Sequence, residues 1–118
     1  MKKATLLSAT TTYPNQESAE NSVKDLVKQG KVACGSIEGP IKSIFLWNGK
    51  LSTEEEWKLT IKFNPKHLQA VESKILDEHP YEIPQWVTTE VMPSKEYHSW
   101  ATNPVSYTHL RAHETSLH

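Results

Sequence analysis

Cys34 and His79 have the residue types of a nucleophile and its general base. Cys34 is the single cysteine of the chain. A reactive thiol needs an adjacent base, and the base is usually oriented by a third residue. The two residues lie on different predicted elements, and no orienting residue is identifiable. The pattern therefore disfavours an enzyme.

Tyr81 and Glu82 lie on a turn between two prolines, which restrict the backbone and hold the two side chains in place. Glu56 and Lys62 lie on the polar face of a predicted strand. Together these four residues predict a cleft between subunits, in which a carboxylate and an ammonium hold a small anionic or zwitterionic ligand. The alternative is a structural ion pair that sets the register between subunits.

The composition limits the classes of protein to which this chain can belong. The 118 residues fit one domain, and 13 Lys and Arg against 14 Asp and Glu disfavour nucleic acid or a membrane surface as partner. No apolar run is long enough to span a membrane. A lone cysteine fits a reducing compartment, so we expect a cytoplasmic protein. Hydrophobic residues make up only 36% of the chain, which favours burial against partner subunits.

Patterns of apolar residues and turn signals predict the elements that position these side chains. Strands are expected at 4–12, 31–38, 41–47, 55–63 and 86–92, and helices at 15–28, from 64 to about 79, and at 94–100. Gly39-Pro40 is expected to break the second strand, and Asn48-Gly49 to form a tight hairpin turn. Asn15, Asn64 and Ser94 are the expected helix caps.

The order β-α-β-β-α-β predicts an α+β fold, the ferredoxin-like sandwich, with a short C-terminal helix. Such a sandwich leaves one face of its sheet bare. Phe45 and Trp47 lie on the face opposite Ile44 and Leu46, so this strand is apolar on both sides. We interpret Phe45 and Trp47 as a subunit interface; the alternative is a strand end covered by the terminal helix.

Several motifs occur in order between residues 4 and 103, which we take as one domain spanning 1–103. They are Thr-Tyr-Pro at 12–14 with Ala19, Lys-Val-Ala-Cys at 31–34, the hairpin at 43–50, the strand at 56–62, His-Pro-Tyr-Glu-Ile-Pro at 79–84, and Tyr97 with Trp100. In these motifs the chain resembles the CutA family, named for divalent-cation tolerance. It departs at Phe63, where the family usually has threonine, and at Gln85, where it usually has an acidic residue.

The resemblance implies a homotrimer, related in architecture to PII-type signalling proteins, that requires no cofactor and binds copper or another divalent ion. The copper ligands of bacterial relatives map to Cys34, His79 and about Thr11, which has no thiol. A thiolate suits Cu(I) and an imidazole suits Cu(II). The alternatives are that Cys34 is a small buried side chain and that His79 stabilises the end of a helix.

Two functions follow as hypotheses. The first is a non-enzymatic, cytoplasmic trimer that binds or responds to divalent metal ions, with copper favoured. The second is a PII-like regulatory trimer that binds a small anionic effector in clefts between subunits. Residues 104–118 lie past the usual end of the family and resemble translated vector sequence, so we exclude them from the domain. Within this segment His109 and His113 are four residues apart, a spacing at which two histidines on a helix can bind a metal ion.

Overall fold

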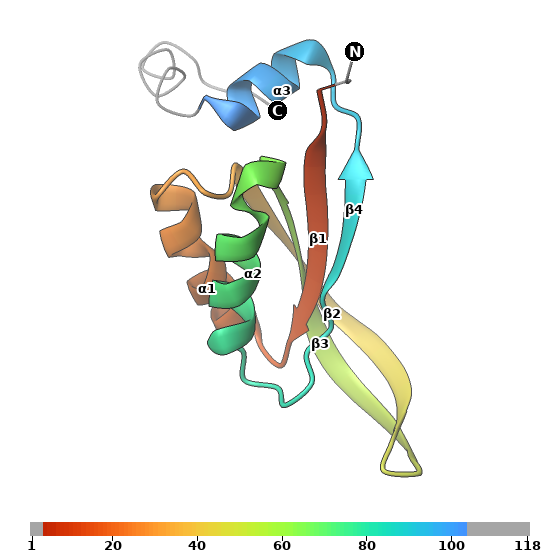
Figure 1. Cartoon of the computed structure of the whole chain (residues 1–118). Helices are drawn as coiled ribbons and strands as arrows, with labels where there is room; N and C mark the ends of the chain where they lie inside the picture. Colours follow the sequence, from red (N-terminus) through yellow and green to blue (C-terminus); the bar gives the residue numbers. More distant parts are fainter. Residues whose placement is uncertain (1–3, 104–118) are drawn as a thin grey trace.

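The computed structural model describes residues 4–103. Its elements are β1 (Leu6–Tyr13), α1 (Gln16–Lys28), β2 (Cys34–Trp47), β3 (Lys50–Phe63), α2 (Leu68–Asp77), β4 (Val87–Val91) and α3 (Lys95–Thr102), with a 3-10 turn at Pro65–His67 before α2. The strands form one antiparallel sheet in the order β2-β3-β1-β4. Helices α1 and α2 cover one side of this sheet, and α3 lies at its far end (Figure 1). The predicted α+β fold and its element order are confirmed.

The core lies between the sheet and the two helices. On β3 every second residue points into it, so Leu59, Ile61 and Phe63 are fully buried. Ala19, Val23 and Leu26 of α1 and Val71 and Ile75 of α2 pack against them. These are the alternating and helical periodicities that the sequence displays.

Helices α1 and α3 begin where the polar side chains predict, whereas Asn64 caps the 3-10 turn and α2 begins at Leu68 without a side-chain cap. The Asn15 side chain accepts from the Ser18 N–H at 2.7 Å, and the Asn64 side chain accepts from the Lys66 N–H at 3.0 Å. The Ser94 hydroxyl accepts from the Tyr97 N–H at 3.2 Å. At its other end, however, α2 stops at Asp77, so His79 follows the helix instead of belonging to its apolar stripe.

Strand β2 differs from the prediction. It begins only at Cys34 and then runs unbroken to Trp47, so Gly39-Pro40 does not end it. The pairing with β3 shifts between Glu38 and Ile41, which is a bulge that absorbs the proline. A bulge keeps the strand continuous, so β2 and β3 form one long hairpin.

We predict that Gly39→Val destabilises the fold. A Cβ atom at this position would lie 2.5 Å from Cδ1 of Trp57 and 3.0 Å from the Glu56 carbonyl oxygen. Overpacking of this kind costs about 1–3 kcal/mol of unfolding free energy, measurable by urea denaturation. Ser36→Val on the exposed part of the same strand is the control. Equal stability of both variants would contradict the prediction.

The hairpin extends away from the body of the molecule (Figure 1). Its turn has Asn48 at φ 52° and Gly49 at φ 79°, the left-handed backbone predicted for this dipeptide. Phe45 and Trp47 are 39% and 43% exposed, and Leu46 is 71% exposed. Helix α3 does not cover them, because its Tyr97 contacts Cys34 at the other end of β2. The alternative of a strand end under the terminal helix is therefore excluded.

Candidate functional site

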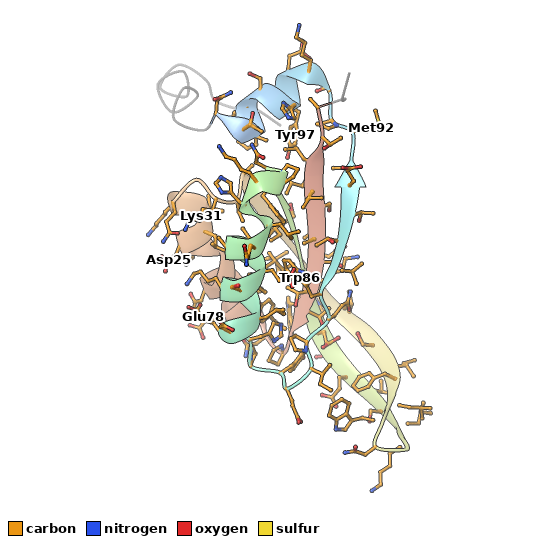
Figure 2. The ribbon with its side chains drawn as sticks, viewed as in Figure 1. Asp25, Lys31, Glu78, Trp86, Met92 and Tyr97 are labelled. Atoms are coloured by element: carbon orange, nitrogen blue, oxygen red, sulfur yellow. The ribbon has the colours of Figure 1, made fainter. Side chains whose placement is uncertain are left out.

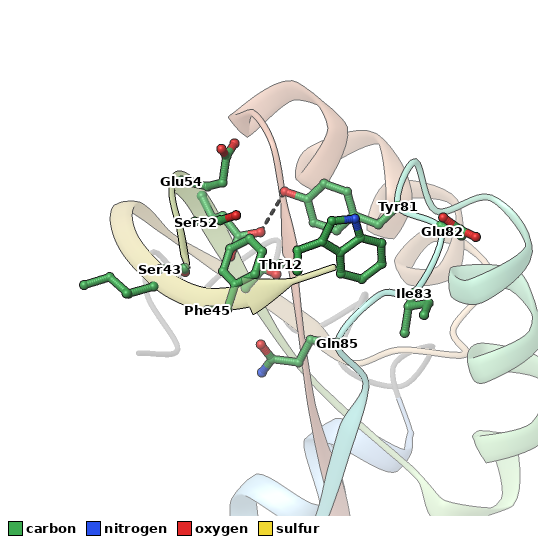
Figure 3. A pocket seen from close by; sticks show the side chains of 12 residues that line it. Thr12, Ser43, Phe45, Ser52, Glu54, Tyr81, Glu82, Ile83 and Gln85 are labelled. Carbon is green, nitrogen blue, oxygen red and sulfur yellow. Dashed lines mark hydrogen bonds between the residues drawn. The ribbon is translucent and has the colours of Figure 1, made fainter. Parts of the chain in front are cut away.

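A groove of about 620 Å³ lies between the hairpin and the segment that joins α2 to β4 (Figure 3). Its lining combines apolar side chains with acidic and small polar ones. The residues are Thr12, Ser43, Ile44, Phe45, Trp47, Ser52, Glu54, Glu56, Tyr81, Glu82, Ile83 and Gln85. Three of the four predicted cleft residues, Glu56, Tyr81 and Glu82, belong to this set.

Glu56 and Tyr81 form the fixed part of the groove. The Tyr81 hydroxyl donates to Oε2 of Glu56 at 2.7 Å (Figure 3). Burial, and then this bond to the carboxylate, raises the pKa of Tyr81, so the phenol stays protonated and remains a donor. The bond joins the α2–β4 segment to β3 and fixes the position of the Tyr81 ring.

Lys62 of the same chain lies away from this groove, so its place in the expected cleft between subunits stays a prediction. It lies on the same strand as Glu56 but six residues further along, or about 20 Å at the rise of an extended chain. There it pairs with Cys34 and Ser8 across the sheet. Among residues 4–103 the lining therefore has three carboxylates, from Glu54, Glu56 and Glu82, and no lysine, arginine or histidine. This charge favours a cation over the small anion that we expected.

His79 is held by contacts behind the groove. Its Nδ1 accepts from the Tyr81 N–H at 3.1 Å, so the proton of the neutral ring is on Nε2, which lies 3.0 Å from the Thr11 hydroxyl. The ring stacks on Tyr13 with a centroid separation of 4.4 Å. Thr11 lies at about the position where the resemblance implies a first-strand cysteine in bacterial relatives. Two of the three mapped positions thus meet in space.

Cys34 lies elsewhere. Its sulfur is 3.2 Å from the Tyr97 hydroxyl, at the end of the molecule opposite the hairpin (Figure 2). Cys34 is separated from Thr11 by two strand spacings across the sheet, about 10 Å. It is also three residues further along the strand direction, which adds about 10 Å in that direction. Within one chain Cys34 and His79 therefore contact different partners. In the described range 4–103, no three His, Cys, Asp or Glu side chains gather closely enough to hold a metal ion.

We predict that His79 makes stability depend on pH. Burial lowers the pKa of His79 below its ordinary value of 6.5 in the folded chain. Between the two values the unfolded chain binds more protons, so the free energy of unfolding rises with pH in this window and falls as the pH drops. Urea denaturation between about pH 5 and 7.5 measures this slope.

The control for this prediction is His79→Gln, which has no titrating ring. The wild type should lose more stability than this variant on acidification. Identical slopes in the two proteins would show that the ring does not supply the effect.

The groove also contains residues that the sequence reasoning missed. Ser43, Ser52 and Glu54 share a sheet face with Phe45, because Phe45 pairs with Ser52 and Ser43 with Glu54. The Asn48-Gly49 turn fixes this register, and counting outward from it would have found all three. The strand predicted at 55–63 begins at Lys50 in the structure, so Ser52 and Glu54 lie outside the predicted range. No sequence signal placed Thr12 or Ile83 here.

The chain matches a known protein family over most of its length. The family model described as CutA1 divalent ion tolerance protein matches residues 7–104. The chain belongs to the CutA1 family. This CutA1 chain is 34% identical over 98 residues to the probable divalent-cation tolerance protein cutA homolog of Encephalitozoon cuniculi, covering 82% of this chain and 85% of that protein. The divalent-cation tolerance protein CutA of Yersinia pestis is 33% identical over 90 residues, which cover 75% and 76% of the two chains.

Solved CutA structures have the same fold. CutA of Xylella fastidiosa superposes with a TM-score of 0.77 at 30% identity, covering 80% of this chain and 92% of that one. The periplasmic divalent cation tolerance protein CutA of Archaeoglobus fulgidus superposes with a TM-score of 0.79 at 28% identity, covering 85% and 98%. Among the described residues of this CutA1 chain, no helix is long and apolar enough to cross a membrane.

Proposed function

We propose that this chain forms a homotrimer that binds or responds to divalent metal ions without catalysing a reaction, and that copper is the favoured ion. Membership of the divalent ion tolerance family supports the class of function. The observation that carries the assembly is the exposed hairpin, where Phe45, Trp47 and Leu46 have no covering element within residues 4–103. A neighbouring copy would bury this surface at a gain of roughly 1.5–3 kcal/mol for each large side chain.

Cys34 and His79 are the proposed copper ligands. Because they contact different partners within one chain, an ion bound by both would join two chains of the assembly. The sulfur suits Cu(I), and the imidazole suits Cu(II) or Zn(II). To bind through Nε2, His79 would have to move its ring proton to Nδ1, which breaks its contact with Thr11 and the bond from the Tyr81 N–H. The Cys34 thiol would bind as the thiolate, so metal binding would be coupled to assembly and would release the thiol proton.

We also propose a cytoplasmic location, on the strength of the single cysteine. The relative from Archaeoglobus fulgidus is described as periplasmic, so the location needs a direct measurement. Fractionation of cells that express the chain without an added leader would provide it. Recovery with periplasmic markers would contradict the proposal.

A PII-like trimer that binds a small anion has less support. Its clefts would need cationic side chains, and the groove of this chain has carboxylates instead. Lys62, the cation expected there, lies six residues away on β3. We therefore do not propose an anionic effector for this groove.

The test combines the mass of the assembly with its copper content. Light scattering should give the mass of a trimer, and equilibrium dialysis should give a fixed ratio of copper to chains. Both are measured with His109, His113 and His118 replaced by alanine, because these histidines can bind metal adventitiously.

The variant Cys34→Ala/His79→Ala should keep the trimeric mass and lose the bound copper. His67→Ala, which removes a histidine remote from the proposed ligands in sequence, is the matched control and should keep it. Equal copper binding by the double variant and the control would remove Cys34 and His79 as ligands. A monomeric mass would overturn the assembly.

A further inference from the structure

Glu56 is a buried carboxylate without a cation. Its residue is 8% exposed, and its Oε2 accepts the Tyr81 hydroxyl. Among the described residues no lysine, arginine or histidine forms an ion pair with it; the lysine two positions along β3, Lys58, pairs with Glu38 at 3.8 Å. Burying a charge is costly unless an opposite charge accompanies it. A cation bound in the groove would therefore stabilise the buried Glu56 carboxylate.

Two further carboxylates share the groove with Glu56. Glu54 and Glu82 lie on opposite sides of the pocket in the view of Figure 3, and both are in its lining. Charges placed around a concave surface add their fields and attract a ligand of opposite sign. Because the described part of the chain places no compensating cation in the lining, an anion would be repelled and a cation attracted.

Aromatic rings form the walls between these carboxylates. Phe45 reaches in from β2 and Tyr81 from the segment before β4 (Figure 3), and Trp47 completes the lining. The faces of such rings attract ammonium and guanidinium groups and bury the apolar part of a ligand. A hydrated metal ion has no apolar part to bury against such rings.

The size of the groove agrees with a small organic molecule. Its volume of about 620 Å³ falls within the range of pockets that hold small molecules. A single metal ion would fill little of it, and the described residues provide no three-ligand group for one.

We propose that this groove binds a small organic cation, an ammonium or guanidinium group on an apolar or aromatic body. The charged group would pair with Glu56, and the apolar body would lie against Phe45 and Trp47. The proposal rests on the proposed function in one respect: the neighbouring chain is expected at the same hairpin and would form the outer wall of the groove.

The test is isothermal titration calorimetry of the full chain with benzyltrimethylammonium as the probe. Benzyl alcohol is the neutral comparison and phenylacetate the anionic one. The Kd for the ammonium should be at least about tenfold lower than for either comparison, because only the ammonium gains the carboxylate and the ring faces. Binding should weaken as salt is added.

Glu56→Gln is the decisive variant, because its amide oxygen still accepts the Tyr81 hydroxyl while the charge is lost. It should weaken the binding of benzyltrimethylammonium about tenfold or more. Glu90→Gln is the matched control: Glu90 is an exposed residue of β4 outside the groove, and its loss removes the same charge. This control should bind as the wild type does.

Light scattering on the same samples separates this proposal from the proposed assembly. A trimer that does not bind the ammonium, or binds phenylacetate or benzyl alcohol as tightly, overturns the organic-cation site alone. A trimer that ignores the probe but dissociates on Glu56→Gln also overturns it, since a cation of the neighbouring chain would then occupy the groove. A single chain that binds the probe with the expected charge dependence supports the site and overturns only the assembly.

Discussion

Replacing Phe45 and Trp47 together by serine will convert the proposed trimer into single chains. The two rings are 39% and 43% exposed in one chain, although both are large and apolar. Burying the exposed surface of one ring against a neighbouring chain contributes roughly 1.5–3 kcal/mol to association. A closed trimer would repeat that contribution in every copy. The double variant therefore leaves Ile44, Leu46 and Leu51 as the large exposed apolar side chains of the hairpin within the described residues, and we expect these three to be insufficient without the rings. Light scattering at micromolar concentration measures the mass.

The matched control is Val27→Ser, because Val27 of α1 is also 39% exposed but lies on a helix away from the hairpin. It should leave the mass of the assembly unchanged. Circular dichroism will establish that the double variant keeps its helices and strands, since neither ring belongs to the core. A folded double variant with the mass of the wild type would show that this surface does not hold the copies together.

Phe63→Thr will destabilise the chain severely, although the family resemblance implies threonine at this position. Phe63 is fully buried at the end of β3 and packs with Val71 and Ile75 of α2. Replacing it leaves a cavity and buries a hydroxyl, at a cost of about 3–5 kcal/mol. That is a large fraction of the 5–15 kcal/mol that stabilises an ordinary domain. Urea denaturation at a fixed chain concentration measures it.

Two controls accompany Phe63→Thr. Phe63→Leu keeps most of the volume and should cost much less, which separates the cavity from the loss of the ring. Lys66→Thr changes an exposed residue three positions away and should be nearly neutral. If Phe63→Thr were as stable as Lys66→Thr, Phe63 could not be packed in the core against α2 as described above.

The amino-acid sequence alone determined the elements that are specified by residues close together in the chain. The Asn48-Gly49 turn fixed the hairpin because few other residues adopt its backbone angles. Alternation along β3 fixed which face is buried, and the side chains of Asn15 and Ser94 fixed the starts of two helices. Each signal acts within a few residues, so it can be identified in the chain without knowledge of the fold.

The limits of α2 and β2 were harder to predict for a physical reason. Gly39-Pro40 ends most strands, but here the Trp57 ring lies against Gly39 and the pairing with β3 continues past a bulge. Tertiary packing overrode a local signal. The family resemblance identified the fold because its motifs occupy most of the chain, and the match over residues 7–104 agrees with it.

Only the tertiary structure decided the groove. Glu56 and Tyr81 are 25 residues apart and meet because β3 and the α2–β4 segment lie side by side, whereas Lys62 shares a strand face with Glu56 yet lies about 20 Å away. The same geometry puts His79 beside Thr11 and leaves Cys34 beside Tyr97. Sequence thus determined which residues each element offers. Packing between distant elements decided which of them meet, because those distances depend on the register and twist of the whole sheet.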